Sequence, residues 1–338
     1  MDLTRRQALI GTLAAPYLIK AGTARAATSL KISHQFPGGT IDQGDFRDRM
    51  CRRFAAEVEK RTNGALRFDI YANSSLMKTN SQFSAMRRGA LDMSLFPIPY
   101  AGGELHACNL GLMPCLVTSY EQGARWKNAE IGKTFAKILE SKGIVFVSWV
   151  WQAGGVASRS SPILAPDSVK GVKIRGGSRE MDRMFAAAGA QVSTMPSNEI
   201  YIGMQTSALD AAVTSSTSLI SFRLEELAKS LTAARKGSFW FMLEPLLMSK
   251  TIFDALPADQ RKIVLDVGAE MEGWATDQAR ADDEEVAKVY AAKGVTVSDM
   301  SEANLAAWRK VAEDSSWKDY AAASTEAAEL LKLAQKVS

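Results

Sequence analysis

Apolar residues follow two different spacings along the chain, and each spacing predicts a different element. Between Leu66 and Ile70 every second residue is apolar, which is typical of a half-buried strand. Between Phe46 and Val58 apolar residues recur at every fourth position, which predicts a helix. Segments of both kinds alternate as far as about residue 214, mostly with glycines between them. Strands that alternate with helices predict an α/β fold with parallel sheets.

Three longer runs are expected to form the framework of the fold. Residues 144–151 and 239–248 are apolar and rich in β-branched or aromatic residues, so each predicts one buried strand. The helical pattern from Ala258 to about Lys293 contains no proline and would be roughly 50 Å long at the helical rise per residue. Such a helix either breaks near Gly273 or spans two domains.

The length of 338 residues predicts two domains that each bury a core. A hydrophobic share of 46% with 23% charged residues is typical of folded proteins and argues against disorder. The chain has no internal repeat and no low-complexity linker. We therefore expect strands and the long helix to join the two domains.

The first 26 residues have the features of an export signal. Arg5 and Arg6 precede an apolar run from Ala8 to Ile19, which is shorter than the about 20 residues that span a bilayer. Ala24–Arg25–Ala26 then fits a cleavage site. The paired arginines favour the twin-arginine route, although a general secretory signal stays open. We expect cleavage after about Ala26 and a mature protein outside the cytoplasm that is not embedded in a membrane.

Most of the positive charge belongs to this signal. The formal net charge is +4, and residues 1–26 contain four basic residues against one acidic residue. The remaining chain is nearly neutral. A nearly neutral chain argues against nucleic acid as a partner.

The sequence lacks the patterns of common catalytic and metal sites. It has no GxSxG, GxGxxG or HExxH, and its two histidines, His34 and His106, do not support a zinc site. No cofactor, no metal and no enzymatic activity are therefore expected. Of the three cysteines, Cys51 is expected to be buried in a helix, whereas Cys108 and Cys115 could pair across a loop.

The strongest candidate for a ligand contact is Arg175. It ends a predicted parallel strand, where α/β proteins bind ligands, and a guanidinium can hold a carboxylate through two parallel hydrogen bonds. Gly176 and Gly177 would let the backbone approach a ligand closely. The residues alone leave a surface arginine equally open. Arg179 and Arg183, offset by neighbouring acids, are interpreted as a solvated helix face.

Hydroxyl and aromatic residues supply two further candidates. Thr214 and Ser215 begin a run of hydroxyl residues after a short apolar strand and could face a polar ligand, or form a plain loop. Trp151 ends one predicted strand, and Phe239 and Trp240 begin another. Core packing is the simpler interpretation of each aromatic residue, but two such clusters predict at least one pocket wall.

Taken in order, these segments resemble the solute-binding proteins of TRAP transporters (DctP type). The likeness extends over essentially the whole mature chain. Its most specific part is Gly171-Val172-Lys173-Ile174-Arg175, followed by Gly189-Ala190, Met195-Pro196, Glu199-Ile200-Tyr201 and Leu209-Asp210 at the spacing of the family.

The resemblance implies a two-lobed periplasmic binding protein fold, in which each lobe is a mostly parallel sheet flanked by helices and a long helix spans both lobes. It implies a first lobe of residues 27–152 with about 240–279, and a second lobe of about 153–239 with 280–338. It also implies a periplasmic protein that closes on a small organic acid, with Arg175 on the carboxylate. The partners it implies are the TRAP membrane subunits, which would receive the acid without ATP.

Departures from the family pattern suggest the kind of acid. Thr214 stands where many members have a ligand-contacting asparagine, and Gly154–Gly155 stands where some have a second arginine. A second ligand carboxylate would then be buried without a partner, which is unfavourable by several kcal/mol. We therefore expect a monocarboxylate with an apolar or aromatic body, of the 2-oxo or 2-hydroxy acid type. The residues expected around it are Gln35, Phe96, Trp151, Gln152, Arg175, Ser197, Thr214, Ser215, Phe239 and Trp240.

Three alternatives stay open from the sequence. The first is a binder of C4-dicarboxylates or sugar acids within the same family. The second is a ligand-sensing partner of a sensor kinase. The third is an exported enzyme on a similar two-lobed frame, against which the missing acid–base pair counts.

Overall fold

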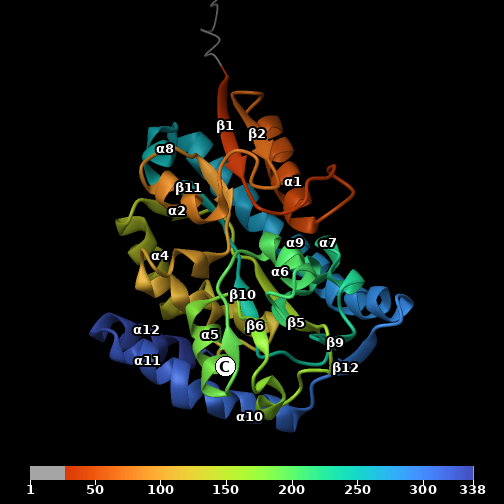
Figure 1. Cartoon of the computed structure of the whole chain (residues 1–338). Helices are drawn as coiled ribbons and strands as arrows, with labels where there is room; N and C mark the ends of the chain where they lie inside the picture. Colours follow the sequence, from red (N-terminus) through yellow and green to blue (C-terminus); the bar gives the residue numbers. More distant parts are fainter. Residues whose placement is uncertain (1–26, 338) are drawn as a thin grey trace, which may run out of the picture.

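The fold consists of two sheets, each covered by its own helices, as Figure 1 shows. The structure is a computed structural model and describes residues 27–337. The predicted export signal, residues 1–26, lies outside the described residues. The α/β class predicted from the sequence is confirmed.

The first lobe is built on a five-stranded sheet of order β2-β1-β3-β11-β4. β1 pairs in parallel with β2 and β3, whereas β11 runs antiparallel to β3 and β4. Helix α1 buries its apolar stripe of Met50, Phe54 and Val58 completely, and the Asp45 side chain caps its first turn. The strands are β1 (Thr28–Ser33), β2 (Leu66–Tyr71), β3 (Met93–Leu95), β4 (Ile144–Phe146) and β11 (Leu246–Ser249), with helices α1 (Phe46–Arg61), α2 (Thr79–Arg87), α3 (Tyr120–Trp126), α4 (Glu130–Ser141) and α8 (Lys250–Ala255).

The second lobe is built on a seven-stranded sheet of order β12-β9-β5-β8-β6-β7, with β10 paired to β5. The pairs of β6 with β7 and β8 are parallel, as predicted, whereas β5 runs antiparallel to β8, β9 and β10. The strands are β5 (Trp151–Ser158), β6 (Lys173–Arg175), β7 (Gln191–Val192), β8 (Ala211–Ser215), β9 (Ser230–Ala233), β10 (Phe241–Leu243) and β12 (Thr296–Asp299), with helices α5 (Arg179–Ala187), α6 (Ile200–Gln205) and α7 (Ser216–Ser221).

Two predicted strands are each divided between the sheets, and the sequence interpretation was wrong there. Residues 144–151 contain all of β4 and the first residue of β5, and residues 239–248 contain β10 and most of β11. Pro245 follows β10, and a proline cannot donate a ladder hydrogen bond. These short breaks carry the chain from one lobe to the other.

The long helix α9 (Ala258–Ala292) is continuous over 35 residues, so the predicted break near Gly273 does not occur. It contacts α1 of the first lobe and α7 of the second. Gly268 lets α9 pack closely against the segment after β4, because a Cβ at Gly268 would lie 2.1 Å from the Val147 carbonyl oxygen. The helix is therefore a support common to both lobes.

The C-terminal segment continues across the molecule after α9. Among its helices, α12 contacts α4 of the first lobe, although the sequence division assigned residues 280–338 to the second. The segment therefore touches both lobes. Its helices are α10 (Glu302–Ala312), a π-helical turn (Glu313–Trp317), α11 (Lys318–Ala322) and α12 (Thr325–Gln335).

All three cysteines are buried and free. Cys51 lies in α1, as predicted. The Cys108–Cys115 pairing that the sequence left open is not formed. Within residues 27–337, no helix combines the length and apolar character that crossing a membrane requires.

Candidate ligand-binding site

Arg175 ends β6 and is almost completely buried, with 1% of its surface exposed. Its guanidinium donates from Nε to the Met195 carbonyl oxygen over 3.0 Å and from Nη1 to the Val213 carbonyl oxygen over 2.9 Å. Nη2 donates to the Tyr100 hydroxyl over 2.7 Å. One N–H group on each Nη remains for a ligand, since a guanidinium carries five N–H groups. N–H groups on the two Nη atoms of a guanidinium are donors that one carboxylate can accept side by side.

Tyr100 connects the two lobes at Arg175. It lies in the 3₁₀ turn η1 (Ile98–Ala101), which follows β3 of the first lobe. Its hydroxyl accepts from Arg175 and, over 3.0 Å, from the backbone N–H of Ser197. Its ring meets Phe96 edge to face, with 6.2 Å between the centroids. The hydroxyl proton of Tyr100 stays available for a ligand oxygen.

Two glycines allow close packing around the site, Gly177 against the Arg175 side chain and Gly154 against Thr214 and Trp240. Gly177 has φ +95°, and a Cβ there would lie 2.6 Å from Nη1 of Arg175. A Cβ at Gly154 would lie 2.4 Å from both the Thr214 carbonyl oxygen and the Trp240 ring. The space beside Gly177 therefore serves the arginine side chain itself.

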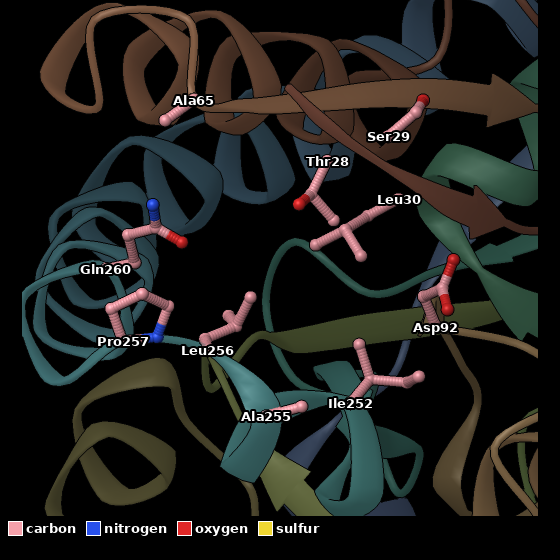
Figure 2. Close-up of a pocket in the computed structure, with 10 residues that line it drawn as sticks. All are labelled: Thr28, Ser29, Leu30, Ala65, Asp92, Ile252, Ala255, Leu256, Pro257 and Gln260. Carbon is pink, nitrogen blue, oxygen red and sulfur yellow. The ribbon is translucent and has the colours of Figure 1, made fainter. Parts of the chain in front are cut away.

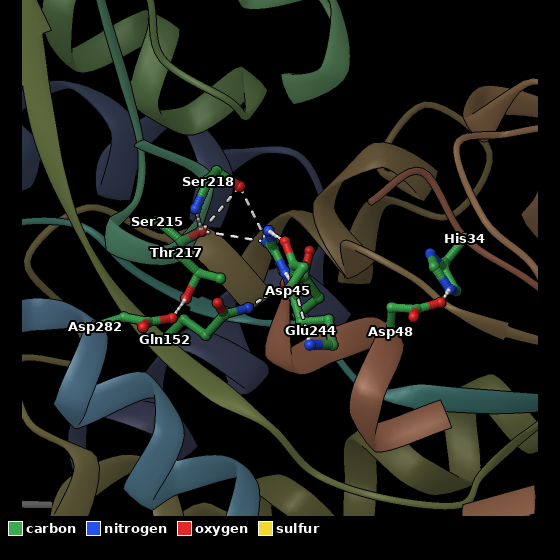
Figure 3. Close-up of polar contacts among 10 residues, drawn as sticks. His34, Asp45, Asp48, Gln152, Ser215, Thr217, Ser218, Glu244 and Asp282 are labelled. Carbon is green, nitrogen blue, oxygen red and sulfur yellow. Dashed lines mark hydrogen bonds and ion pairs between the residues drawn. The ribbon is translucent and has the colours of Figure 1, made fainter. Parts of the chain in front are cut away.

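A second buried arginine, Arg47, lies at the junction of the lobes. It donates to both carboxylate oxygens of Asp45 and, over 3.2 and 3.0 Å, to the hydroxyls of Ser215 and Ser218. Asp45, Ser215 and Ser218 are labelled in Figure 3. It also pairs with Glu244, with 3.3 Å between Nη1 and Oε2. Arg47 comes from α1 of the first lobe and the two serines from β8 and α7 of the second. This cluster therefore joins the lobes through buried polar groups.

The two acids of the Arg47 cluster have pKa values that shift in opposite directions. Burial opposes ionisation of Asp45, but the charge and hydrogen bonds of Arg47 hold the pKa of Asp45 below its ordinary value. Burial raises the pKa of Glu244, although Arg47 acts in the opposite direction. Glu244 also accepts from Gln152. Within the described residues, Gln35 Nε2, Gln152 Oε1 and Glu244 Oε1 are buried without a hydrogen-bond partner, so they can serve a polar ligand.

Asp283 of α9 accepts a hydrogen bond from the first residue of α7. It accepts from Ser216 over 2.5 Å and from Tyr120 over 2.7 Å. Burial raises the pKa of Asp283 to about 6. As pH rises, Asp283 loses its proton at a lower pH in the unfolded chain than in the folded protein. The contribution of Asp283 to the free energy of unfolding therefore falls as pH rises from about 4 to about 6.

We expect Asp283→Asn to raise the Tm at pH 8 and to change it little at pH 4.5, because the amide carries no charge to bury. Thermal unfolding followed by circular dichroism at both pH values measures this. The control is Glu285→Gln, since that carboxylate is exposed on the same helix. An equal shift of Tm at both pH values would show that Asp283 does not titrate in this range.

The structure brings several predicted site residues together. Phe96 and Ser197 contact Tyr100 beside Arg175, and Trp240 donates to the Gly176 carbonyl oxygen over 3.3 Å. Gln152 and Ser215 belong to the Arg47 cluster. Thr214 is buried on β8 next to Ser215 and opposite Gly155. Gln35 is buried and accepts from Thr79 of α2, within the first lobe.

Two predicted residues pack elsewhere. Trp151 meets Trp126 of α3, with 5.1 Å between the ring centroids. Phe239 lies between Phe185 and Trp308 in the core of the second lobe. The simpler interpretation, core packing, describes both contacts. The aromatic wall beside Arg175 is therefore smaller than the sequence suggested.

Tyr100, Arg47 and Asp45 were missed from the sequence. Tyr100 follows Pro97 and Pro99 in a short turn that has no helical or strand periodicity. Arg47 is one of several basic residues along α1, a pattern that normally indicates a solvated face. The N-cap position of Asp45 was the one available signal, because it fixes where α1 begins.

Among the pockets formed by residues 27–337, two differ in their relation to Arg175. One, shown in Figure 2, lies between the start of β1 and the α8–α9 turn, and none of the predicted site residues lines it. The other is formed by both lobes and is lined by Tyr100 and Met195, two of the three residues whose oxygens accept from Arg175. The second pocket therefore adjoins the candidate site.

Residues 42–323 match the family model described as bacterial extracellular solute-binding protein, family 7, DctP. The chain belongs to this family. DctP-family proteins are solute-binding receptors, so this protein binds a solute and is not an enzyme. The TRAP resemblance stated from the sequence is confirmed.

Similar proteins include relatives with known ligands. A solute-binding protein of Albidiferax ferrireducens is 57% identical over 336 residues, covering 99% of both chains. The solved structure of a TRAP periplasmic solute-binding protein from Rhodoferax ferrireducens with bound malonate is 59% identical, has a TM-score of 0.90, and covers 91% of this chain and 98% of that chain. The C4-dicarboxylate-binding periplasmic protein DctP of Rhodobacter capsulatus is 27% identical over 316 residues, 91% of this chain and 92% of that protein. These likenesses confirm the two-lobed fold of the DctP family.

Proposed function

We propose that this protein captures a compact organic carboxylate in the periplasm by closure of its lobes around Arg175 and delivers it to the membrane subunits of a TRAP transporter. The observation that supports this proposal is the environment of the Arg175 side chain. It is buried, it is held by Tyr100 of the opposite lobe, and each Nη keeps one N–H group beyond the one that it donates within the protein. Periplasmic location and removal of residues 1–26 belong to the same proposal.

The arrangement of charge favours an acid with a single carboxylate. Arg47 is already paired with Asp45 and Glu244, so Arg175 is the cation that the inner site offers. The second end of the acid then meets neutral groups, among them Gln35 and Gln152. An oxo or hydroxyl oxygen fits such groups. Because Trp151 and Phe239 pack elsewhere, we propose a small 2-oxo or 2-hydroxy acid with a compact apolar body.

A small diacid is the second candidate. The 59% identical protein from Rhodoferax ferrireducens has malonate bound. Here a second carboxylate would lie near the Arg47 cluster only if Glu244 took up a proton, which its raised pKa favours. Binding of a dianion, but not of a monoanion, would then be accompanied by proton uptake.

A screen of thermal stability tests the function. At a ligand concentration of 100 times Kd, an acid that binds the folded protein stabilises it by roughly 2.7 kcal/mol. We expect small 2-oxo and 2-hydroxy acids to raise the Tm, malonate to raise it less at pH 8 than at pH 6, and aryl-substituted acids to have little effect. Neutral sugars serve as controls. If no organic acid raises the Tm, the proposed function is wrong.

A further inference from the structure

The hydroxyl residues that follow β8 have partners on two sides of α7. Ser215 and Ser218 accept hydrogen bonds from Arg47, which belongs to α1 of the first lobe. Thr217, which lies between them in the sequence, donates to Asp282 of α9 over 2.7 Å (Figure 3). The bonds from Arg47 cross from one lobe to the other, whereas the bond to Asp282 joins α7 to the helix common to both lobes. Neighbouring hydroxyls of α7 therefore differ in whether they join the lobes directly.

Groups of the first lobe hold the Arg47 side chain in position. Nε and Nη2 donate to the Asp45 carboxylate over 2.9 and 2.6 Å. The Phe36 ring lies against the guanidinium, with 3.6 Å between Cζ and the ring centroid. Nη1 instead contacts Glu244 and the hydroxyls of Ser215 and Ser218. Arg47 is therefore preorganised on the first lobe, with Nη1 directed to the second.

The contact between Arg47 and the two serines lies in the interior of the molecule. Arg47, Ser215 and Ser218 are each 1% exposed. Separation of the lobes would break both hydrogen bonds and would bring water to the guanidinium and to the two hydroxyls. These bonds therefore belong to the closed arrangement of the lobes. A contact that is made in one of two arrangements shifts the equilibrium towards that arrangement, whichever ligand is bound.

We propose that Arg47, Ser215 and Ser218 form a clasp, which stabilises the closed arrangement of the lobes without contacting the ligand. Ser218 is then a positioning residue, because it acts on capture through the time that the lobes stay closed. The inference rests on the proposed function, since it needs an acid that is captured by lobe closure. Release of the acid requires the lobes to reopen, so loss of the clasp should act mainly on the dissociation rate constant, koff.

Ser218→Ala is the variant that tests the clasp. It removes one acceptor of Arg47, and alanine is favourable within a helix. Ser215 is less suitable, because its side chain caps α7 by accepting from the Ser218 N–H over 3.1 Å. Thr217→Val is the matched control, since it removes the neighbouring hydroxyl, and with it the bond to Asp282, but keeps the volume of the side chain.

Stopped-flow binding to the mature protein measures koff and the association rate constant, kon. Pyruvate and malonate are the probes, and the best acid of the stability screen replaces either one that does not bind. For Ser218→Ala we expect koff to rise about fivefold with both acids and kon to change less than about twofold, the effect of one lost hydrogen bond in the closed arrangement. Thr217→Val should leave koff within about twofold of wild type.

The outcomes separate the clasp from the function on which it rests. An unchanged koff in Ser218→Ala would overturn the clasp, as would an equal rise in Thr217→Val. A rise with one acid and not with the other would show that Ser218 contacts the ligand, which also contradicts the proposal. In each of these cases, acid binding by the wild type leaves the proposed function intact. Wild-type protein that binds no acid of the stability screen would overturn both.

Discussion

Arg175→Gln is expected to lower the affinity for the captured acid at least 100-fold. Glutamine is too short to replace the two parallel donors on the guanidinium, and it removes the positive charge beside the ligand carboxylate. Two hydrogen bonds to a charged group contribute about 1.5–3 kcal/mol each, and a 100-fold change in Kd corresponds to about 2.7 kcal/mol. Isothermal titration with the best acid of the stability screen measures the loss.

The same substitution also tests the structural contacts of Arg175. The Met195 and Val213 carbonyl oxygens lose their donors, so the ligand-free protein should have a lower Tm as well. Lys173→Gln is the control, because Lys173 lies two residues earlier on β6 and is exposed. Lys173→Gln should keep both affinity and Tm. A Kd within threefold of wild type for Arg175→Gln would mean that the carboxylate lies elsewhere.

The regular elements were predictable because their apolar spacing is local. The stripe of α1 and the alternation of β2 are visible within a few residues, and both elements occur where expected. The two lobe crossings were not predictable in the same way. Residues 144–151 are mostly apolar on both sides of the crossing, although β4 belongs to the sheet of the first lobe and Trp151 begins a strand of the second. Hydropathy shows that a residue is buried, but it does not show in which sheet.

The candidate site was predictable only in part, for a similar reason. Arg175 was found because it ends a strand and belongs to an ordered motif. Tyr100 reaches it from 75 positions away in the chain, and Arg47 reaches Ser215 from 168 positions away. Such contacts exist only after the lobes have come together. The sequence therefore indicated the arginine that we propose as the carboxylate contact, and it missed the residues that join the lobes around it.

Among substitutions in the candidate site, we expect Arg47→Met to lower the stability of the protein most. Removal of the arginine leaves Asp45 buried with an uncompensated charge, and breaking a buried pair in this way is unfavourable by about 3–5 kcal/mol. We expect a fall in Tm of roughly 10 °C. Arg53→Met, on the same helix but in an exposed pair with Asp42, is the control and should change stability by less than about 1 kcal/mol.

A second substitution distinguishes the charge of Asp45 from loss of packing. In Arg47→Met the pKa of Asp45 should rise above its unfolded value, so the free energy of unfolding should fall further as pH increases. Asp45→Asn added to Arg47→Met removes the buried charge and keeps an N-cap residue for α1, so it should restore part of the lost stability and abolish that pH dependence. Urea unfolding of the four proteins of this cycle at pH 5.5 and 8 measures both effects. A double variant no more stable than Arg47→Met, with the same pH dependence, would show that Arg47 stabilises the junction by packing and by its bonds to Ser215 and Ser218 rather than by balancing Asp45.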